Sequence, residues 1–144
     1  MIRRFNRYEL KYVVDACRYR ALVDDLQHFM VPDSHGDPSG SYPIVSLYYD
    51  SPELEAFYSK IEGLRFRRKL RLRVYPPGGD VRQVTLGHVE IKQRINRTVQ
   101  KRRLVLPLAQ AEALRRADEP PAELDALDAA VASEVHYMVR AQQL

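Results

Sequence analysis

The feature that most constrains this chain is a strict alternation of apolar and basic residues in RFRRKLRLRVYP, residues 65–76. Leu70, Leu72 and Val74 fall at even positions. The odd positions are basic: Arg65, Arg67, Lys69, Arg71 and Arg73. Because side chains alternate between the two faces of a strand, this segment predicts a strand with one apolar face and one cationic face. Its apolar face must pack on a core, which leaves the cationic face for solvent or for the inside of a barrel.

The two segments that follow repeat this pattern. Residues 81–95 are predicted to form a strand that ends in VEIKQRI, with Glu90 and Lys92 on one face. Asn96-Arg97 predicts a tight hairpin turn. The returning segment TVQKRRLVL carries Lys101 and Arg103 on one face. Several cations held close together repel each other, so we expect an anion to occupy the space that they face.

The rest of the chain predicts helices that cover this sheet. Further strands are expected at residues 4–14 and 44–50, separated by a Pro/Gly/Ser/Asp-rich loop at 32–43. Helices are expected from Asp15 as N-cap to about Met30, from Ser51 as N-cap to Gly63, at 108–117 and at 122–143. About five strands and four helices in this order predict an α+β fold with a mostly antiparallel sheet.

Composition narrows the class of protein further. The chain has 144 residues, a length that fits one domain, and a net charge of +4. Residues 60–103 hold 14 Lys/Arg and 3 Asp/Glu, a net charge of +11 between two acidic flanks. The single cysteine, Cys17, excludes a disulfide framework and favours the cytoplasm. No stretch approaches the ~20 apolar residues of a transmembrane helix.

The basic segment predicts a polyanionic partner: nucleic acid, an anionic membrane, a nucleotide or polyphosphate. Phosphate fits best, because arginine offers a planar fork to its oxygens and lysine a point charge. RNA ranks last, because few aromatic residues interleave with the cations. Glu9 and Glu90 are candidates to orient the cations or to hold a divalent metal. Solvated surface charge is the simpler interpretation for a subset of the arginines: Arg65, Arg67, Arg68 and Arg102.

Several motifs in order resemble one family over essentially the whole chain. They are RYELKYVV, SLYYDSPEL, KLRLRVY, VEIKQR and VQKRR. Together they resemble the VTC domain, the catalytic domain of the vacuolar transporter chaperone complex, which has stand-alone bacterial relatives. The VTC domain belongs to the triphosphate tunnel metalloenzymes, or CYTH-like superfamily. The hydrolase branch of that superfamily opens with ExExK, whereas this chain has Arg7 at the first of those positions, which favours the VTC branch.

The resemblance implies a tunnel-shaped antiparallel β-barrel lined with basic residues and covered by helices. It implies a polyphosphate polymerase that transfers the γ-phosphoryl group of ATP to a growing polyphosphate chain with Mn²⁺ or Mg²⁺. Carried over by position, the catalytic and phosphate-binding residues are Lys11, Arg71, Arg73, Lys92 and Lys101, with Arg103 as a further phosphate-binding residue. Glu9 and Glu90 are the metal candidates.

The resemblance also implies a domain that continues past residue 144, since five strands cannot close a tunnel of about eight. We therefore expect residues 1–144 to form a single, incomplete VTC domain. A non-catalytic module that binds polyphosphate or nucleotide is the alternative to an enzyme. The expected partners are ATP and polyphosphate, with a homodimer or a second chain completing the tunnel. A peripheral membrane partner is a further candidate, and no specific nucleic acid is expected.

Overall fold

The computed structural model describes residues 4–7, 10–38, 40–116 and 123–144. The strands are β1 (Arg4–Arg7), β2 (Val45–Tyr49), β3 (Phe66–Val74), β4 (Leu86–Ile95) and β5 (Thr98–Pro107). The α-helices are α1 (Ala16–Leu26), α2 (Glu55–Ile61), α3 (Leu108–Arg115) and α4 (Ala126–Gln142). Two short 3-10 turns, Pro77–Gly79 and Val81–Gln83, precede β4, so the strand predicted at 81–95 begins later than expected.

The five strands form one antiparallel sheet in the order β1-β5-β4-β3-β2. The predicted α+β class is confirmed, and the sheet is open in the described residues rather than closed into a barrel. The predicted hairpin is also confirmed, because Ile95 pairs with Thr98 across a two-residue turn in which Asn96 has a φ of 55°.

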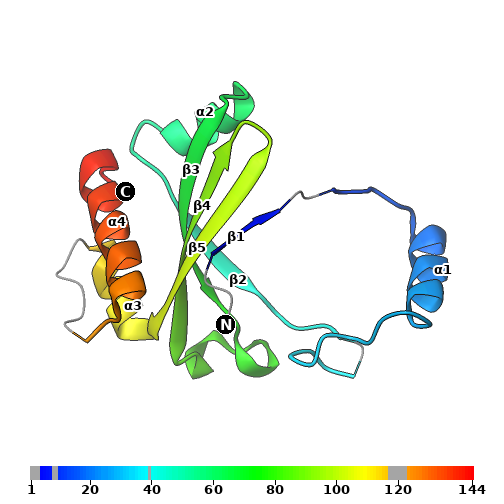
Figure 1. Ribbon diagram of the computed structural model, residues 1–144. Coiled ribbons are helices and arrows are strands. Elements are labelled where there is room, and N and C mark those ends of the chain that lie inside the picture. Colours follow the sequence, from blue (N-terminus) through cyan, green and yellow to red (C-terminus); the bar gives the residue numbers. More distant parts are fainter. Residues whose placement is uncertain (1–3, 8–9, 39, 117–122) are drawn as a thin grey trace.

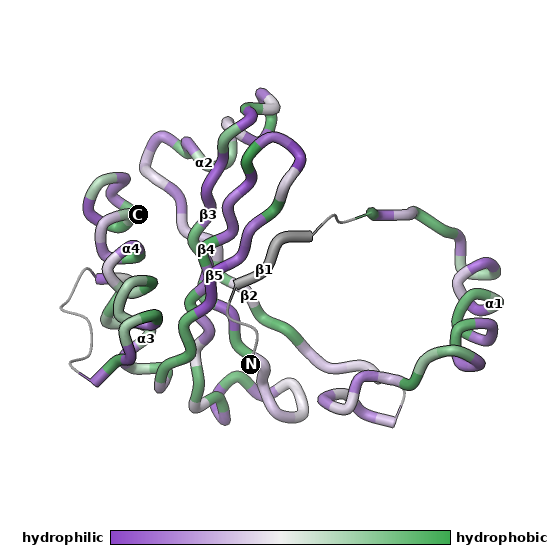
Figure 2. The backbone as a smooth tube through the Cα atoms, in the orientation of Figure 1, coloured by the Kyte–Doolittle hydropathy of each residue, from purple (hydrophilic) through white to green (hydrophobic). Residues whose placement is uncertain are grey.

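The hydrophobic core lies between the sheet and the pair of helices α3 and α4 (Figure 1). Leu70, Ile91 and Leu104 from the strands meet Leu114 and Met138 from the helices, and each is at most 2% exposed. Burial of one such side chain stabilises the fold by about 1.5–3 kcal/mol. Figure 2 shows hydrophilic stretches along β3, β4 and β5, whose successive side chains alternate between the face that packs on the core and the other face of the sheet.

The N-terminal segment departs from the prediction. The described part of β1 ends at Arg7, so Lys11 lies outside the strand in which the alternation placed it. Asp15 caps α1 as predicted by accepting a hydrogen bond from the Arg18 N–H at 2.9 Å, but the helix ends at Leu26. No residue of α1 is buried, so the helix contributes nothing to the hydrophobic core of the described residues.

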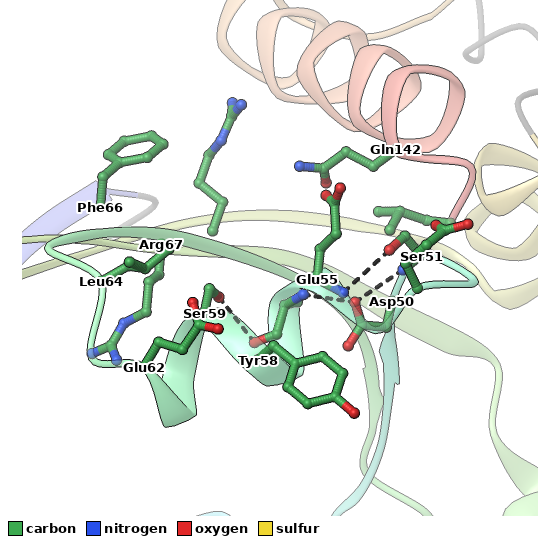
Figure 3. A pocket seen from close by; sticks show the side chains of 14 residues that line it. Asp50, Ser51, Glu55, Tyr58, Ser59, Glu62, Leu64, Phe66, Arg67 and Gln142 are labelled. Carbon is green, nitrogen blue, oxygen red and sulfur yellow. Dashed lines mark hydrogen bonds between the residues drawn. The ribbon is translucent and has the colours of Figure 1, made fainter.

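The start of α2 was predicted wrongly. Ser51 does not cap the first helical turn; the chain first turns through Leu54, whose φ of 57° is left-handed. The cap is Asp50, one of whose carboxylate oxygens accepts from the Ala56 N–H at 2.7 Å (Figure 3). Its other oxygen accepts from the Phe57 N–H at 2.9 Å. A carboxylate can satisfy two of the free N–H groups at a helix start, whereas the Ser51 hydroxyl accepts only from Glu55, at 3.2 Å.

The connection between β1 and β2 sets the environment of the charged face. These strands follow each other in the chain but occupy opposite edges of the sheet, so their connection must cross its width. Helices α3 and α4 cover one face, and the connection that carries α1 lies on the other side (Figure 1). We call its described part, residues 10–38 and 40–44, the arch. The cationic face of the sheet therefore looks toward the arch.

Candidate functional site: the cationic sheet face

The register of the central strands aligns three lysines in a row. Lys69 on β3 pairs with Lys92 on β4, and Lys92 pairs in turn with Lys101 on β5. Directly opposed residues on one face have Cβ atoms about 4.5–5.5 Å apart, and like charges at that spacing destabilise a sheet. We call these three residues the lysine row. An anion bound over the lysine row would reduce the repulsion between these like charges.

The neighbouring row is built around a buried carboxylate. Arg71, Glu90 and Arg103 are direct cross-strand partners on β3, β4 and β5. The Glu90 side chain is fully buried, and its Oε2 accepts from Arg71 Nε at 2.5 Å while its Oε1 accepts from Arg103 Nε at 2.7 Å. The ammonium group of Lys101 lies 3.6 Å from Oε1. One carboxylate thus holds two arginines in fixed geometry and offsets part of a third positive charge.

These contacts shift the pKa values of the cluster. Burial alone would raise the pKa of Glu90, but the charges of Arg71 and Arg103 and their hydrogen bonds outweigh it and lower that pKa. Burial works against the charge of Arg71, yet Glu90 and the Tyr48 hydroxyl, 2.7 Å from Arg71 Nη1, raise its pKa. Burial is the main cause that lowers the pKa of Lys101. The charge of Glu90 opposes this shift, and the charges of Arg103 and Arg71 add to it. Glu90 is therefore ionised at neutral pH, and Lys101 releases its proton more readily than an ordinary lysine.

The surroundings of Glu90 fit an orienting role and not a metal-binding one. Both of its oxygens accept hydrogen bonds from arginines, and the adjacent Lys101 would repel a divalent cation. Over the described residues, no group of three or more His, Cys, Asp or Glu side chains is arranged to hold a metal ion. The second metal candidate, Glu9, lies outside the described residues. The described side chains thus do not fit Mn²⁺ or Mg²⁺.

A groove of about 900 Å³ lies beside the lysine row, between the arch, α2 and the hairpin end of β3–β5. Its lining includes seven cations: Lys11, Lys60, Arg67, Lys69, Lys92, Arg94 and Arg97. Among the described residues that line it, none is an aspartate or glutamate. We call this hollow the basic groove. Its positive charge, set in a concave surface, focuses the electric field and attracts anions.

The structure brings most of the predicted site residues together. Lys92 and Lys101 stand in the lysine row, Arg71 and Arg103 flank Glu90, and Lys11 reaches the basic groove from the arch. Arg73 lies farther along the same face, where its Nε donates to the Ser46 hydroxyl at 3.1 Å.

Other groove residues were missed by sequence reasoning. Lys69 shares the alternation of Arg71, and only the register between strands shows that it stands opposite Lys92. Arg67, interpreted as a surface charge, lines the basic groove. Arg94, two residues after Lys92 on β4, shares the face that the alternation predicts for Glu90 and Lys92, although it was not named as a site residue. Lys60 from α2 and Arg97 from the hairpin turn have no face pattern that connects them to the site.

Arg68 and Arg102, which were predicted to be solvated surface charges, instead contact α4. Arg68 and Arg102 lie on the helix-covered face, where α4 contributes Glu134. Arg102 Nη2 donates to Glu134 Oε1 at 2.5 Å, and Arg68 Nη1 lies 3.6 Å from the same oxygen. Both side chains are largely buried, so they help to dock α4 on the sheet and are not solvated charges. Arg65 is exposed, as predicted.

A comparison of the sequence with models of known protein families identifies the family of this chain. The family model of the VTC domain matches residues 6–144. The chain belongs to the VTC family. A polyphosphate-related function and the tunnel-enzyme superfamily go with this family, and VTC domains generally use divalent metals. A search of curated proteins finds no match to this VTC domain. In the described portion of the chain, no helix is long and apolar enough to cross a membrane.

Proposed function

We propose that this VTC domain binds chains of phosphate, namely the triphosphate of ATP and polyphosphate, on its cationic face. The observation that carries the proposal is the lysine row, in which three lysines stand opposite one another on three neighbouring strands. Like charges directly opposed in a sheet repel each other, and a bound anion would lower that repulsion. A phosphate chain repeats its negative charge along its length and can contact the row and the basic groove together.

The reaction that we propose is transfer of the γ-phosphoryl group of ATP to polyphosphate. Phosphoryl transfer depends mostly on positioning and on neutralising charge. Arg71 and Arg103 are suited to this role, because their contacts with Glu90 fix them before a substrate arrives. The lysine row supplies mobile point charges beside them.

A non-catalytic module that holds polyphosphate or a nucleotide is the second candidate. Two observations favour it: the sheet is open in the described residues, and both oxygens of Glu90 are engaged by arginines. An open face leaves bound phosphates in contact with water, whereas transfer enzymes exclude water from the reacting group.

Binding is tested by calorimetric titration with tripolyphosphate. Lys69→Ala combined with Lys92→Ala should lower the affinity by at least about tenfold, since a charge-assisted hydrogen bond is worth about 1.5–3 kcal/mol. Arg65→Ala is the matched control, because Arg65 is an exposed cation that does not line the basic groove. Equal affinities for the double variant and the control would refute the site.

Catalysis is tested by incubation of the purified chain with ATP and Mn²⁺, followed by a polyphosphate gel. Polymer that depends on the lysine row supports the polymerase. Tight binding of tripolyphosphate without polymer supports the non-catalytic module.

We also propose that a second copy of the chain pairs at a sheet edge and covers the cationic face. β2 is an edge strand, and edge strands with free backbone groups favour association. Size-exclusion chromatography with light scattering should show a dimer, and a stable monomer at high concentration would contradict this proposal.

A further inference from the structure

A second hollow, of about 990 Å³, lies at the end of the cationic face opposite the basic groove. Its lining includes the rings of Tyr42, Tyr75 and His88 beside proline and glycine residues of two loops and the acidic Asp37. Tyr75 meets His88 edge to face, with ring centroids 4.9 Å apart, and Tyr42 from the arch lies 5.9 Å from Tyr75. Arg103 also lines it. We call this the aromatic hollow.

The aromatic hollow and the lysine row belong to one continuous face. His88 and Lys92 are both on β4 with Glu90 midway between them, so all three side chains point the same way. At about 3.3 Å per residue, His88 and Lys92 are separated by roughly 13 Å along the strand. Arg103 joins the two ends, because it lines the aromatic hollow and also binds Glu90.

The chemistry of the aromatic hollow differs from that of the basic groove. The pKa of His88 is lowered, mainly by burial and then by the charge of Arg103, so its ring is neutral at pH 7. Its Nδ1 is buried and has no hydrogen-bond partner among the described residues. Neutral aromatic rings are poor phosphate ligands, but they are the usual platforms for flat heterocycles such as nucleobases.

We propose that the aromatic hollow holds the base of a nucleoside triphosphate, with Tyr75 as the stacking platform. The triphosphate then runs past Arg103 toward the lysine row. This inference rests on the proposed binding of phosphate chains and adds a direction to it. The nucleoside lies at the Tyr75 end of the face, and the terminal phosphate points toward the basic groove.

The test compares ATP with tripolyphosphate, which carries a triphosphate without a base. In calorimetric titrations the unaltered chain should bind ATP more tightly than tripolyphosphate. Tyr75→Ala should lower the affinity for ATP by about 5- to 150-fold, the range expected for loss of one stacked base, and leave tripolyphosphate binding unchanged. Tyr75→Phe keeps the ring and should retain ATP binding.

The control and the contrary results separate this inference from the function on which it rests. Lys92→Ala should weaken both ligands. If neither ligand binds the unaltered chain, the proposed function fails and this inference fails with it. If both bind equally well, or if Tyr75→Ala weakens both alike, only the base site is overturned. Circular dichroism checks the fold of each variant, and Tyr42→Ala replaces Tyr75→Ala if the latter unfolds.

Discussion

Glu90→Gln tests the charge balance of the sheet face most directly. Glutamine has nearly the shape of glutamate, but it removes the carboxylate charge that pairs with Arg71, Arg103 and Lys101. The three largely buried cations would then lose the negative charge of Glu90. The variant isolates the electrostatic contribution of Glu90 from its packing.

The expected loss is large for a single substitution. Removing one partner of a buried ion pair costs about 3–5 kcal/mol, whereas the whole free energy of unfolding of a domain is roughly 5–15 kcal/mol. Glu112→Gln is the matched control, because Glu112 is an exposed residue of α3 and its loss should change stability by no more than about 0.5 kcal/mol.

The pH dependence of this loss follows from the lowered pKa of Glu90. A carboxylate with a depressed pKa in the folded state stabilises the fold fully above its ordinary pKa of 4.5. That contribution disappears as the pH falls through the lower folded value. The stability difference between the unaltered chain and Glu90→Gln should therefore be greatest at neutral pH and shrink in acid.

Urea unfolding followed by circular dichroism measures both effects. Tripolyphosphate should stabilise Glu90→Gln more than the unaltered chain, because it restores negative charge beside three uncompensated cations. If the variant does not fold alone, recovery of its helical signal on adding tripolyphosphate is the readout. A difference below about 1 kcal/mol at pH 7, with no acid dependence, would refute the reasoning.

Three further predictions concern separate parts of the fold. Lys92→Gln should lower the affinity of the chain for tripolyphosphate by about tenfold, because it removes one positive charge from the lysine row; an unchanged affinity in calorimetric titration would contradict this. Asp50→Ala should cost about 1–2 kcal/mol by uncapping α2, more than Ser51→Ala, and equal losses would remove the assignment of Asp50 as the cap. Gly87→Ala should cost about 1–3 kcal/mol, because the new Cβ would lie 2.7 Å from the Ala111 Cβ; an unchanged melting temperature would show that α3 shifts freely.

The alternation along the chain was sufficient to predict the sheet and its faces. Period-two patterns place Arg71, Lys92 and Lys101 on one face without knowledge of which strands are neighbours. Cross-strand partners depend on register, which the Asn96 turn fixes for β4 and β5. The pairing of Lys69 with Lys92 depends on the long connection between β3 and β4. Its register could therefore not be derived from the sequence.

The sequence left two roles open for Glu90, orienting the cations or holding a metal. The structure shows Glu90 paired with Arg71 and Arg103, so it offsets part of the charge for which the sequence argument expected an external anion. The burial of the carboxylate and its distances to neighbouring cations distinguish such an ion cluster from a metal site. Neither can be derived from the alternation of residues along a strand. Similarly, Arg68 and Arg102 looked solvated because nothing in the sequence placed Glu134 of α4 above them.

The route of the arch limits which molecules can reach the cationic face, and how. Because the arch leaves one edge of the sheet and returns at the other, backbone and sheet together form a closed loop around that face (Figure 1). If phosphate chains bind this face as proposed, a linear chain would enter the loop by one of its free ends. A cyclic phosphate of the same charge has no end to insert. The proposed function therefore favours open-ended polymers over rings of the same charge.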